Sequence, residues 1–358
     1  MTSLIPRIPG IDFDGFGKQL GYLEVEHSDN ENDAAVIPSP IAVIRGGRGP
    51  TVLLTAGTHG DEYEGQVLLQ ELIRSLGPDD LDGRLIILPA LNISAVREGR
   101  RVSEVDGVNL NRALPGRKDG GPAQQIASIV AEDLIPMADY VIDIHSGGSA
   151  SEYVPSAFVY LGPTEELWAE KISAVEAFNV PYSVVVKPML KAGSISSAAD
   201  RAGVPMISAE LGGCGTVSLP ILARARKGLR SLLAHWGVLR NGSRTPREPV
   251  RWVELGAGSA VRSTMAGLME PLVELGQSVS AGDVVARVHS VEELDRPAKD
   301  FHAPLGGVVA VVRHPALVNV GTTLVNRRRP RDNTTERRPC DVVISSPPPR
   351  SSRRQQSP

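Results

Sequence analysis

The chain has 358 residues, which is long enough for about two domains and a sizeable core. Ordinary proportions of hydrophobic (41%) and charged (22%) residues exclude wholesale disorder, and two cysteines are too few for a disulfide framework, which fits a reduced, cytoplasmic setting. A formal charge of −3 gives no reason to expect nucleic acid or a membrane as a partner.

The first 50 residues are typical of short strands and turns, and we expect them to precede the main sheet. They lack the continuous apolar segment of a signal peptide. Nowhere along the chain do about 18 apolar residues follow one another, so no membrane span is expected.

A short apolar run at residues 51–56 predicts a fully covered strand, and apolar positions recur at helical spacing over residues 65–76. Between them lie His59 and Glu62, whose spacing of three residues lets both side chains point toward one centre. In a sheet flanked by helices, such loops form the crevice at the carboxyl ends of the strands, where ligands usually bind. The pair is therefore a candidate for metal binding that needs a third ligand.

The third candidate ligand is His145, which ends the apolar strand predicted at residues 140–145 and precedes a Ser-Gly-Gly turn. Two histidines and one carboxylate with an open fourth position are typical of a catalytic zinc site. The alternative for the first pair is a surface His-x-x-Glu without any metal. Asp143 emerges on the same face of the strand as His145, so it either holds the N–H of a ligand histidine or makes a hydrogen bond elsewhere in the core.

The segments around these candidates alternate between strands and helices. Another buried strand is expected at residues 84–89, followed over residues 92–122 by a long loop without periodicity, which is usually functional in a compact domain. Further helices are expected at residues 123–135, 164–178 and 219–236, and further strands at 156–161, 183–187 and 205–210. The alternation predicts an α/β fold with a mostly parallel sheet flanked by helices.

Glu210 ends the strand predicted at residues 205–210 and precedes a glycine-rich turn. A single carboxyl group can take a proton from an attacking water and return it to a departing amine. The alternatives are that Glu210 caps the following turn or pairs with an arginine.

From about residue 251 the helical period gives way to short alternating runs broken by glycines, after a linker at residues 237–250. This pattern predicts a small all-β domain at residues 251–326. It resembles the folded sandwich of biotinyl and lipoyl carriers. The expected hairpin tip at residues 290–293 has no lysine, and Lys299 is too close to the next strand, so we expect a structural cap and not a swinging carrier arm.

The last segment, residues 327–358, holds nine arginines and three acidic residues, a net charge of +6. Its Pro, Ser and Arg bias predicts disorder, and a basic arm for an acidic partner is the alternative. The expected division is therefore an α/β domain at residues 1–240, a β-domain at 251–326 and a basic tail at 327–358.

Four stretches resemble a known family: GTHGDEYEG (57–65), DGVNLNRALPG (106–116), DIHSGG (143–148) and AELGGCGT (209–216). Their order resembles zinc carboxypeptidases of the carboxypeptidase A type and, more closely, the succinylglutamate desuccinylase and aspartoacylase family. Within that family they look most like the bacterial N-acetyl-diaminobutyrate deacetylases of ectoine breakdown. The resemblance covers about residues 40 to 325.

The resemblance implies one zinc ion per subunit, bound by His59, Glu62 and His145. It also implies that Glu210 occupies the position of the catalytic glutamate of the family. Zinc would lower the pKa of a bound water to about 7 and so make hydroxide available near neutral pH.

The resemblance also assigns roles to an asparagine and to arginines of the long loop at residues 92–122. Asn111 and Arg112 correspond to the pair that holds a substrate carboxylate, which a guanidinium fork can bind with two hydrogen bonds. Arg101 corresponds to the arginine that faces the oxyanion, and the neighbouring Arg97 and Arg100 leave this assignment open.

By the resemblance, the chain hydrolyses the amide bond of a small N-acyl amino acid, with N-acetyl-L-2,4-diaminobutyrate as the expected substrate. N-Succinylglutamate and N-acetylaspartate are alternatives; an aspartate-type substrate would need one more cation in the pocket, which the sequence does not assign. A non-catalytic carrier or binding module is a further alternative, and the missing carrier lysine argues against it. Beyond its small-molecule substrate, the chain could form a homo-oligomer.

Overall fold

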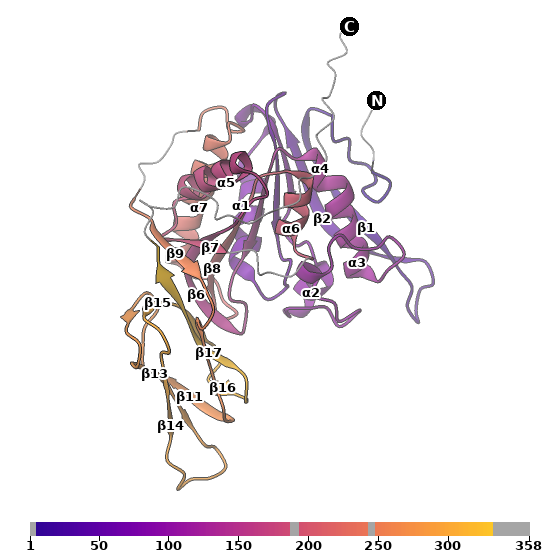
Figure 1. Cartoon of the computed structure of the whole chain (residues 1–358). Helices are drawn as coiled ribbons and strands as arrows, with labels where there is room; N and C mark the ends of the chain where they lie inside the picture. Colours follow the sequence, from indigo (N-terminus) through magenta and orange to yellow (C-terminus); the bar gives the residue numbers. More distant parts are fainter. Residues whose placement is uncertain (1–4, 187–192, 243–247, 332–358) are drawn as a thin grey trace.

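The computed structural model describes residues 5–186, 193–242 and 248–331 (Figure 1). Helices surround one large sheet, and a β-rich part formed by the last described strands extends from one end of this body. An α/β part followed by an all-β part agrees with the predicted fold class.

Within the described residues, thirteen strands join in the main sheet. From one edge to the other they are β1 (Gly17–His27), β2 (Ala35–Arg45), β4 (Arg84–Leu88), β3 (Thr51–Ala56), β5 (Tyr140–His145), β8 (Met206–Gly213), β6 (Ser151–Tyr160), β7 (Tyr182–Val186), β9 (Arg251–Leu255), β17 (Thr323–Pro330), β15 (Gly307–Arg313) and β12 (Ser278–Val279), with β10 (Ala260–Arg262) beside β17. All strands predicted from apolar runs are present: β3 and β5 have the predicted bounds, and β4, β6, β7 and β8 differ at one or both ends, with residue 187 of the prediction at 183–187 outside the described residues.

The sheet is mixed, which corrects the predicted mostly parallel arrangement. β4, β3, β5 and β8 pair in parallel, but β1 with β2, β2 with β4, and β6 with β8 are antiparallel. β6 follows β5 after only residues 146–150, whereas a parallel connection needs a dozen or more residues. The first 50 residues also contribute β1 and β2 to this sheet and do not merely precede it.

Helices cover both faces of the sheet. One face carries α1 (Tyr63–Ser75), α5 (Glu165–Phe178) and α7 (Leu219–His235). The other face carries α3 (Pro122–Ile129), its π-helical continuation η3 (Val130–Leu134), α4 (Ile135–Met137) and α6 (Ile195–Ala202). Short helices lie in the loops: η1 (Pro78–Asp80), α2 (Ile93–Glu98) and η2 (Leu110–Arg112). Leu53 and Leu54, neighbours on β3, belong to the two opposite cores, which is why the β3 sequence is apolar throughout.

The β-rich part is joined to the main sheet by strand pairing. Its second sheet consists of β14 (Lys299–His302), β13 (Val284–His289), β11 (Gly267–Pro271) and β16 (Leu317–Val318). β9, expected to begin a separate domain, pairs instead with β7, and β15 pairs with both β17 and β6. The strands β6, β7, β9, β17 and β15 therefore form a closed ring of pairings that links the two parts.

The last strand corrects the predicted start of the disordered tail. β17 continues to Pro330, and Arg327 and Arg328 are buried. Pairing with β15 satisfies the backbone, and the guanidinium of Arg327 donates a hydrogen bond to the carbonyl of Gly258 at 2.9 Å. The rest of the predicted tail, residues 332–358, lies outside the described residues.

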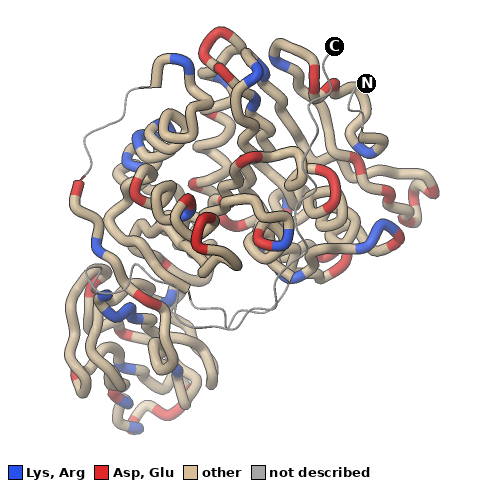
Figure 2. Tube along the Cα trace, turned by 45° about the horizontal axis from the view of Figure 1, so that its top comes forward, with Lys and Arg blue, Asp and Glu red and all other residues tan. Residues whose placement is uncertain are grey.

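None of the described helices has the length and hydropathy that crossing a membrane would require. Basic and acidic segments are interspersed along the chain in both parts of the molecule (Figure 2). Cys214 is a free thiol.

Candidate active site

The loop between β3 and α1 folds back tightly and directs His59 and Glu62 inward. Gly57 has a φ of +67°, a left-handed conformation that favours glycine and turns the chain at the end of β3. Gly60 lies against α2, where an added Cβ atom would come within 2.0 Å of the carbonyl carbon of Ala95. Glycine at these two positions therefore permits the shape of the loop.

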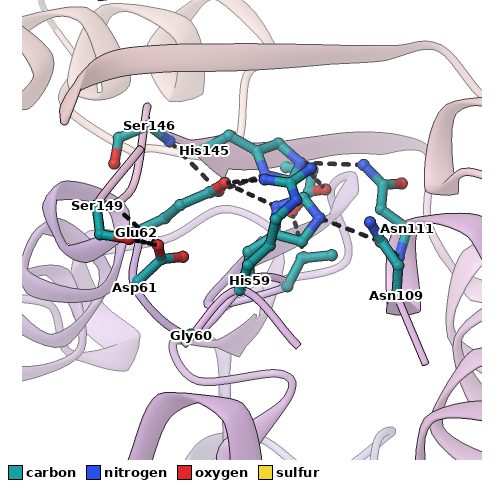
Figure 3. Close-up of polar contacts among 12 residues, drawn as sticks. His59, Gly60, Asp61, Glu62, Asn109, Asn111, His145, Ser146 and Ser149 are labelled. Atoms are coloured by element: carbon teal, nitrogen blue, oxygen red, sulfur yellow. Dashed lines mark hydrogen bonds and ion pairs between the residues drawn. The ribbon is translucent and has the colours of Figure 1, made fainter. Parts of the chain in front are cut away.

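Three buried side chains meet at the carboxyl ends of β3 and β5 (Figure 3). Glu62 Oε1 lies 2.7 Å from His59 Nδ1, and Glu62 Oε2 lies 2.7 Å from His145 Nδ1. The centres of the two imidazole rings are 5.2 Å apart. One ligand atom from each residue can be chosen so that all three lie within 4.8 Å of one another. The structure therefore brings the three predicted ligands together.

The donor set fits a divalent metal ion. Two imidazole nitrogens and a carboxylate are the usual protein ligands of catalytic zinc. The ring nitrogens turned away from Glu62 have partners of their own: His59 Nε2 lies 3.2 Å from Asn109 Oδ1, and His145 Nε2 lies 2.7 Å from Asp143 Oδ2. Such partners fix the orientation of a ligand histidine, so both Nδ1 atoms face the same point.

Asp143 makes hydrogen bonds in the core and also lies within ion-pair distance of His145. Its Oδ2 atom lies beside the ring of His145, while Oδ1 accepts hydrogen bonds from the hydroxyls of Thr55 at 2.7 Å and Thr58 at 3.0 Å. These two threonines belong to β3 and to the ligand loop. Asp143 therefore joins the elements that supply the two histidines.

The three groups depend on each other electrostatically. Burial opposes the ionisation of Glu62, but His145 and His59 outweigh it and hold the pKa of this carboxyl below its usual range. Burial would also lower the pKa of His145, but Asp143 and Glu62 raise it well above its usual value. Because metal ligands must be deprotonated, a divalent cation here would replace the proton that the raised pKa keeps on His145.

Glu210 lies beside this group, opposite His145 in the parallel register of β5 and β8. Its Oε2 atom is buried, and within the described part of the chain it has no hydrogen-bond partner. Neither a turn cap nor an ion pair with arginine, the alternatives from the sequence, is found for Glu210 there. Burial raises the pKa of Glu210 to about 8, and the charge of His145 limits the rise. A carboxyl with such a pKa can hold or release a proton near neutral pH.

The structure distinguishes Arg101 from the exposed Arg97 and Arg100 by its contact with the buried group. Arg101 Nη1 lies 3.2 Å from Glu62 Oε1, so Arg101 reaches the buried group, whereas Arg100 pairs with Glu104 at the surface. The side chain of Arg101 is 53% exposed. It therefore lies where the site meets solvent.

Asn111 and Arg112 lie on η2, close to the ligand group. Asn111 Oδ1 accepts a hydrogen bond from the backbone N–H of Ile195 at 3.2 Å, and Asn111 Nδ2 lies 3.5 Å from His145 Nε2. Arg112 is exposed and donates to the carbonyl of Asn111. The predicted substrate-binding pair therefore borders the site, with Asn111 fixed in place by α6.

Sequence reasoning did not single out Asn109, which lies beside His59, or several residues around Glu210. Asn109 lies within the DGVNLNR stretch, so that motif carried a signal for it. Tyr153 and Tyr160 lie on β6, which pairs with the strand that carries Glu210; burial raises the pKa values of both phenols, and the charge of Glu210 adds to both effects. Arg328 on β17 lies over the ring of Phe158 on β6, 5.9 Å from its centre, and its charge acts to lower the pKa of Glu210. The tyrosines and Arg328 reach the site through strand pairing, for which no local pattern gives a signal.

Asp61 and Glu64 flank Glu62 in the sequence. Neither belongs to the metal-binding group. Asp61 Oδ2 accepts hydrogen bonds from the backbone N–H and the hydroxyl of Ser149, both at 2.8 Å. The buried Glu64 accepts one from the N–H of Gly213 at 3.2 Å. The two carboxyls therefore tie the start of α1 to the turn after β5 and to the end of β8.

A helix-flanked sheet that gathers two histidines and a carboxylate at its strand ends, beside another buried carboxyl group, is the arrangement of a hydrolase whose site could bind a metal ion. The model of the succinylglutamate desuccinylase/aspartoacylase catalytic domain matches residues 48–236. The chain belongs to this family, whose members hydrolyse amide bonds.

Individual relatives match over nearly the whole chain. The N-alpha-acetyl-L-2,4-diaminobutyric acid deacetylase of Halomonas elongata is 36% identical over 315 residues, which are 88% of this chain and 92% of that protein. A product-bound structure of the ectoine utilization protein EutE (DoeB) from Ruegeria pomeroyi has a TM-score of 0.87 and 36% identity, and covers 91% of this chain and 99% of its own. A succinylglutamate desuccinylase from Silicibacter sp. TM1040 matches with the same values.

Removing one imidazole should remove metal binding. We expect His145→Ala to bind Zn²⁺ at least about 100-fold more weakly than the wild type, because two ligands replace three. Competition with a chromophoric chelator measures the affinity. His289→Ala, which changes an exposed histidine of the β-rich part, serves as the control and should bind Zn²⁺ normally. Equal affinities of His145→Ala and the wild type would contradict the ligand assignment.

The buried Glu64 should make stability depend on pH. Burial raises the pKa of Glu64 from 4.5 to about 7, so its contribution is fully present below pH 4.5 and is lost as the pH rises through 7. Glu64→Gln should therefore gain stability relative to the wild type between pH 4 and pH 8, by up to about 3 kcal/mol. Urea unfolding with chelator present measures the difference. Glu166→Gln changes an exposed glutamate and serves as the control: its stability relative to the wild type should not vary with pH. A stability difference between Glu64→Gln and the wild type that does not vary with pH would show that the pKa of Glu64 is not raised by folding.

Proposed function

We propose that the protein is a zinc-dependent deacetylase that hydrolyses N-acetyl-L-2,4-diaminobutyrate, a reaction of ectoine breakdown. The observation that carries this proposal is the buried His59, Glu62 and His145 group beside Glu210, in a chain 36% identical to a diaminobutyric acid deacetylase over 88% of its length. The proposed setting is the cytoplasm, and the partner is the small acyl amino acid.

His59, Glu62 and His145 would hold one zinc ion per subunit. When bound, zinc lowers the pKa of a coordinated water to about 7 and polarises a carbonyl group. Glu210 then acts through its buried Oε2 atom, which accepts a proton from the attacking water. The same atom returns the proton to the amide nitrogen, so that the amine leaves as a neutral group.

The two loop arginines would act on the charges of the substrate. Arg101, which already reaches Glu62, faces the carbonyl oxygen as negative charge develops on it; one such donor is worth about 3 kcal/mol of transition-state stabilisation. Asn111 and Arg112 bind the carboxylate of the amino acid. An exposed guanidinium on a well-anchored helix can close onto a substrate without rearrangement of the fold.

The β-rich part is proposed to be a sandwich of the biotinyl and lipoyl type that caps a zinc-carboxypeptidase-like domain, with boundaries near residues 240 and 251. A carrier role is disfavoured because Lys299 lies within the β13–β14 pairing, opposite Val288, and donates to the hydroxyl of Thr264 at 2.9 Å. It is therefore held in a strand and not presented at a hairpin tip.

A substrate panel with and without chelator tests the proposal. We expect purified protein to hydrolyse N-acetyl-L-2,4-diaminobutyrate with a higher kcat/KM than N-succinyl-L-glutamate or N-acetyl-L-aspartate. Activity should disappear with chelator and return with Zn²⁺. Turnover that survives complete removal of metal would overturn the mechanism, and preference for either dicarboxylic substrate would overturn the substrate assignment.

Replacing Glu210 should separate catalysis from metal binding. Glu210→Ala is expected to keep the wild-type metal content and to lose roughly 10²- to 10⁴-fold in kcat, because the proton carrier is absent. Elemental analysis and single-substrate kinetics measure the two quantities. The surface variant Glu166→Ala should match the wild type in both. Loss of metal along with activity in Glu210→Ala would show a structural role.

A further inference from the structure

β17 carries three consecutive arginines in different surroundings. Arg329 is exposed, whereas Arg327 and Arg328 are buried. Val308 lies opposite Arg328 in the antiparallel register and belongs to the apolar cluster that contains Phe158. The guanidinium carbon of Arg328 lies 5.9 Å from the centre of the Phe158 ring. Arg328 therefore points from the C-terminal strand toward β6.

Glu210 projects from the same face of the sheet as Phe158, the residue that Arg328 contacts. In the pairing of β6 with β8, Ser156 lies opposite Glu210 and Phe158 lies opposite Ser208. Residues opposed in this way project from the same face of a sheet. Glu210 and Phe158 therefore share a face, and Arg328 lies over it.

Two tyrosines border the same space. Burial lowers the pKa of Arg328, while Tyr153, Glu210 and Tyr160 are near enough to oppose this effect. The charge of Arg112, on η2, acts to lower the pKa of Tyr160. Tyr153 and Tyr160 pack against the apolar cluster that contains Phe158, and Arg112 and Arg328, from elements that are far apart in the chain, both act electrostatically on Tyr160.

Among the described residues, the guanidinium of Arg328 makes no ion pair. Its Nη1 atom donates to Asn326 Oδ1 at 2.6 Å, and its Nε atom is buried without any partner among the residues described. No ion pair within residues 5–186, 193–242 and 248–331 includes Arg328. Withdrawing an unpaired cation from water is unfavourable unless an anion replaces its hydration. An incoming carboxylate would find a guanidinium with donors still available.

We propose that Arg328, together with Arg112, binds the α-carboxylate of the acyl amino acid. This inference rests on the proposed function, which puts the scissile amide beside Glu210. The α-carbon bears both the amide nitrogen and the carboxylate, so the carboxylate lies next to the nitrogen that Glu210 protonates. Arg328 is then a substrate-binding residue supplied by the last strand, and the β-rich part completes the site as well as capping it.

Neutral and charged substrates test this assignment directly. Arg328→Met removes the charge and keeps an apolar stem. Its KM for N-acetyl-L-2,4-diaminobutyrate should rise roughly 10- to 100-fold, while its KM for the α-carboxamide of the same compound should change by less than about twofold. Arg328→Lys keeps the charge but lacks the guanidinium fork. Its KM for N-acetyl-L-2,4-diaminobutyrate should lie between those of the wild type and Arg328→Met. Arg329→Gln, the exposed neighbour, and Arg327→Met, the buried one, should leave the ratio of the two KM values unchanged.

Calorimetry gives a measure independent of turnover. The wild type should bind the product L-2,4-diaminobutyrate more tightly than its carboxamide, and Arg328→Met should reduce this preference roughly 10-fold. An unchanged preference, an equal rise in both KM values, or an effect confined to N-acetyl-L-aspartate would overturn the α-carboxylate assignment. If the wild type hydrolyses no acyl amino acid, the proposed function fails, and the calorimetric comparison still decides the role of Arg328.

Discussion

The buried carboxylate of Glu62 is the group on which the site and the centre of the sheet depend. A carboxylate withdrawn from water is strongly unfavourable unless positive charge or hydrogen bonds compensate for the lost hydration. His59 comes from the same loop as Glu62, but His145 ends β5 and lies 83 positions after Glu62 in the sequence. Only the parallel pairing of β3 with β5 brings the two strand ends together. The central strands therefore hold two imidazoles on either side of one carboxylate.

The sequence predicts the parts of this arrangement that follow from local order. His59, Glu62, His145 and Glu210 each end or follow an apolar run, and the carboxyl ends of parallel strands meet at one edge of a sheet. The observed registers agree, because Ala56 lies opposite Ile144 and His145 lies opposite Glu210. Local patterns were therefore enough to place three ligands and the neighbouring glutamate in one region.

Pairing between distant segments could not be predicted in this way. Alternating polarity predicts a strand but not the strand with which it pairs. The sequence therefore did not assign β1, β2 and β9 to the main sheet. Tyr153 depends in addition on an irregular register in β6 between Tyr153 and Ser156, which changes the relation between sequence position and face. The neighbours of Glu210 thus come from long-range pairing, whereas the metal ligands come from motifs.

The composition of the last strand predicted disorder from residue 327, although β17 continues to Pro330. A run of arginines is typical of disorder, because charged side chains resist burial. Successive strand residues face opposite sides, however, so Arg327 finds a carbonyl partner in the β-rich part while Arg328 turns toward Phe158 and the face of Glu210. Folding gains little from a buried guanidinium without a counter-charge. Its presence at the junction is better explained by the chemistry of the site, where an anionic substrate would supply the charge that the protein lacks, than by the stability of the fold.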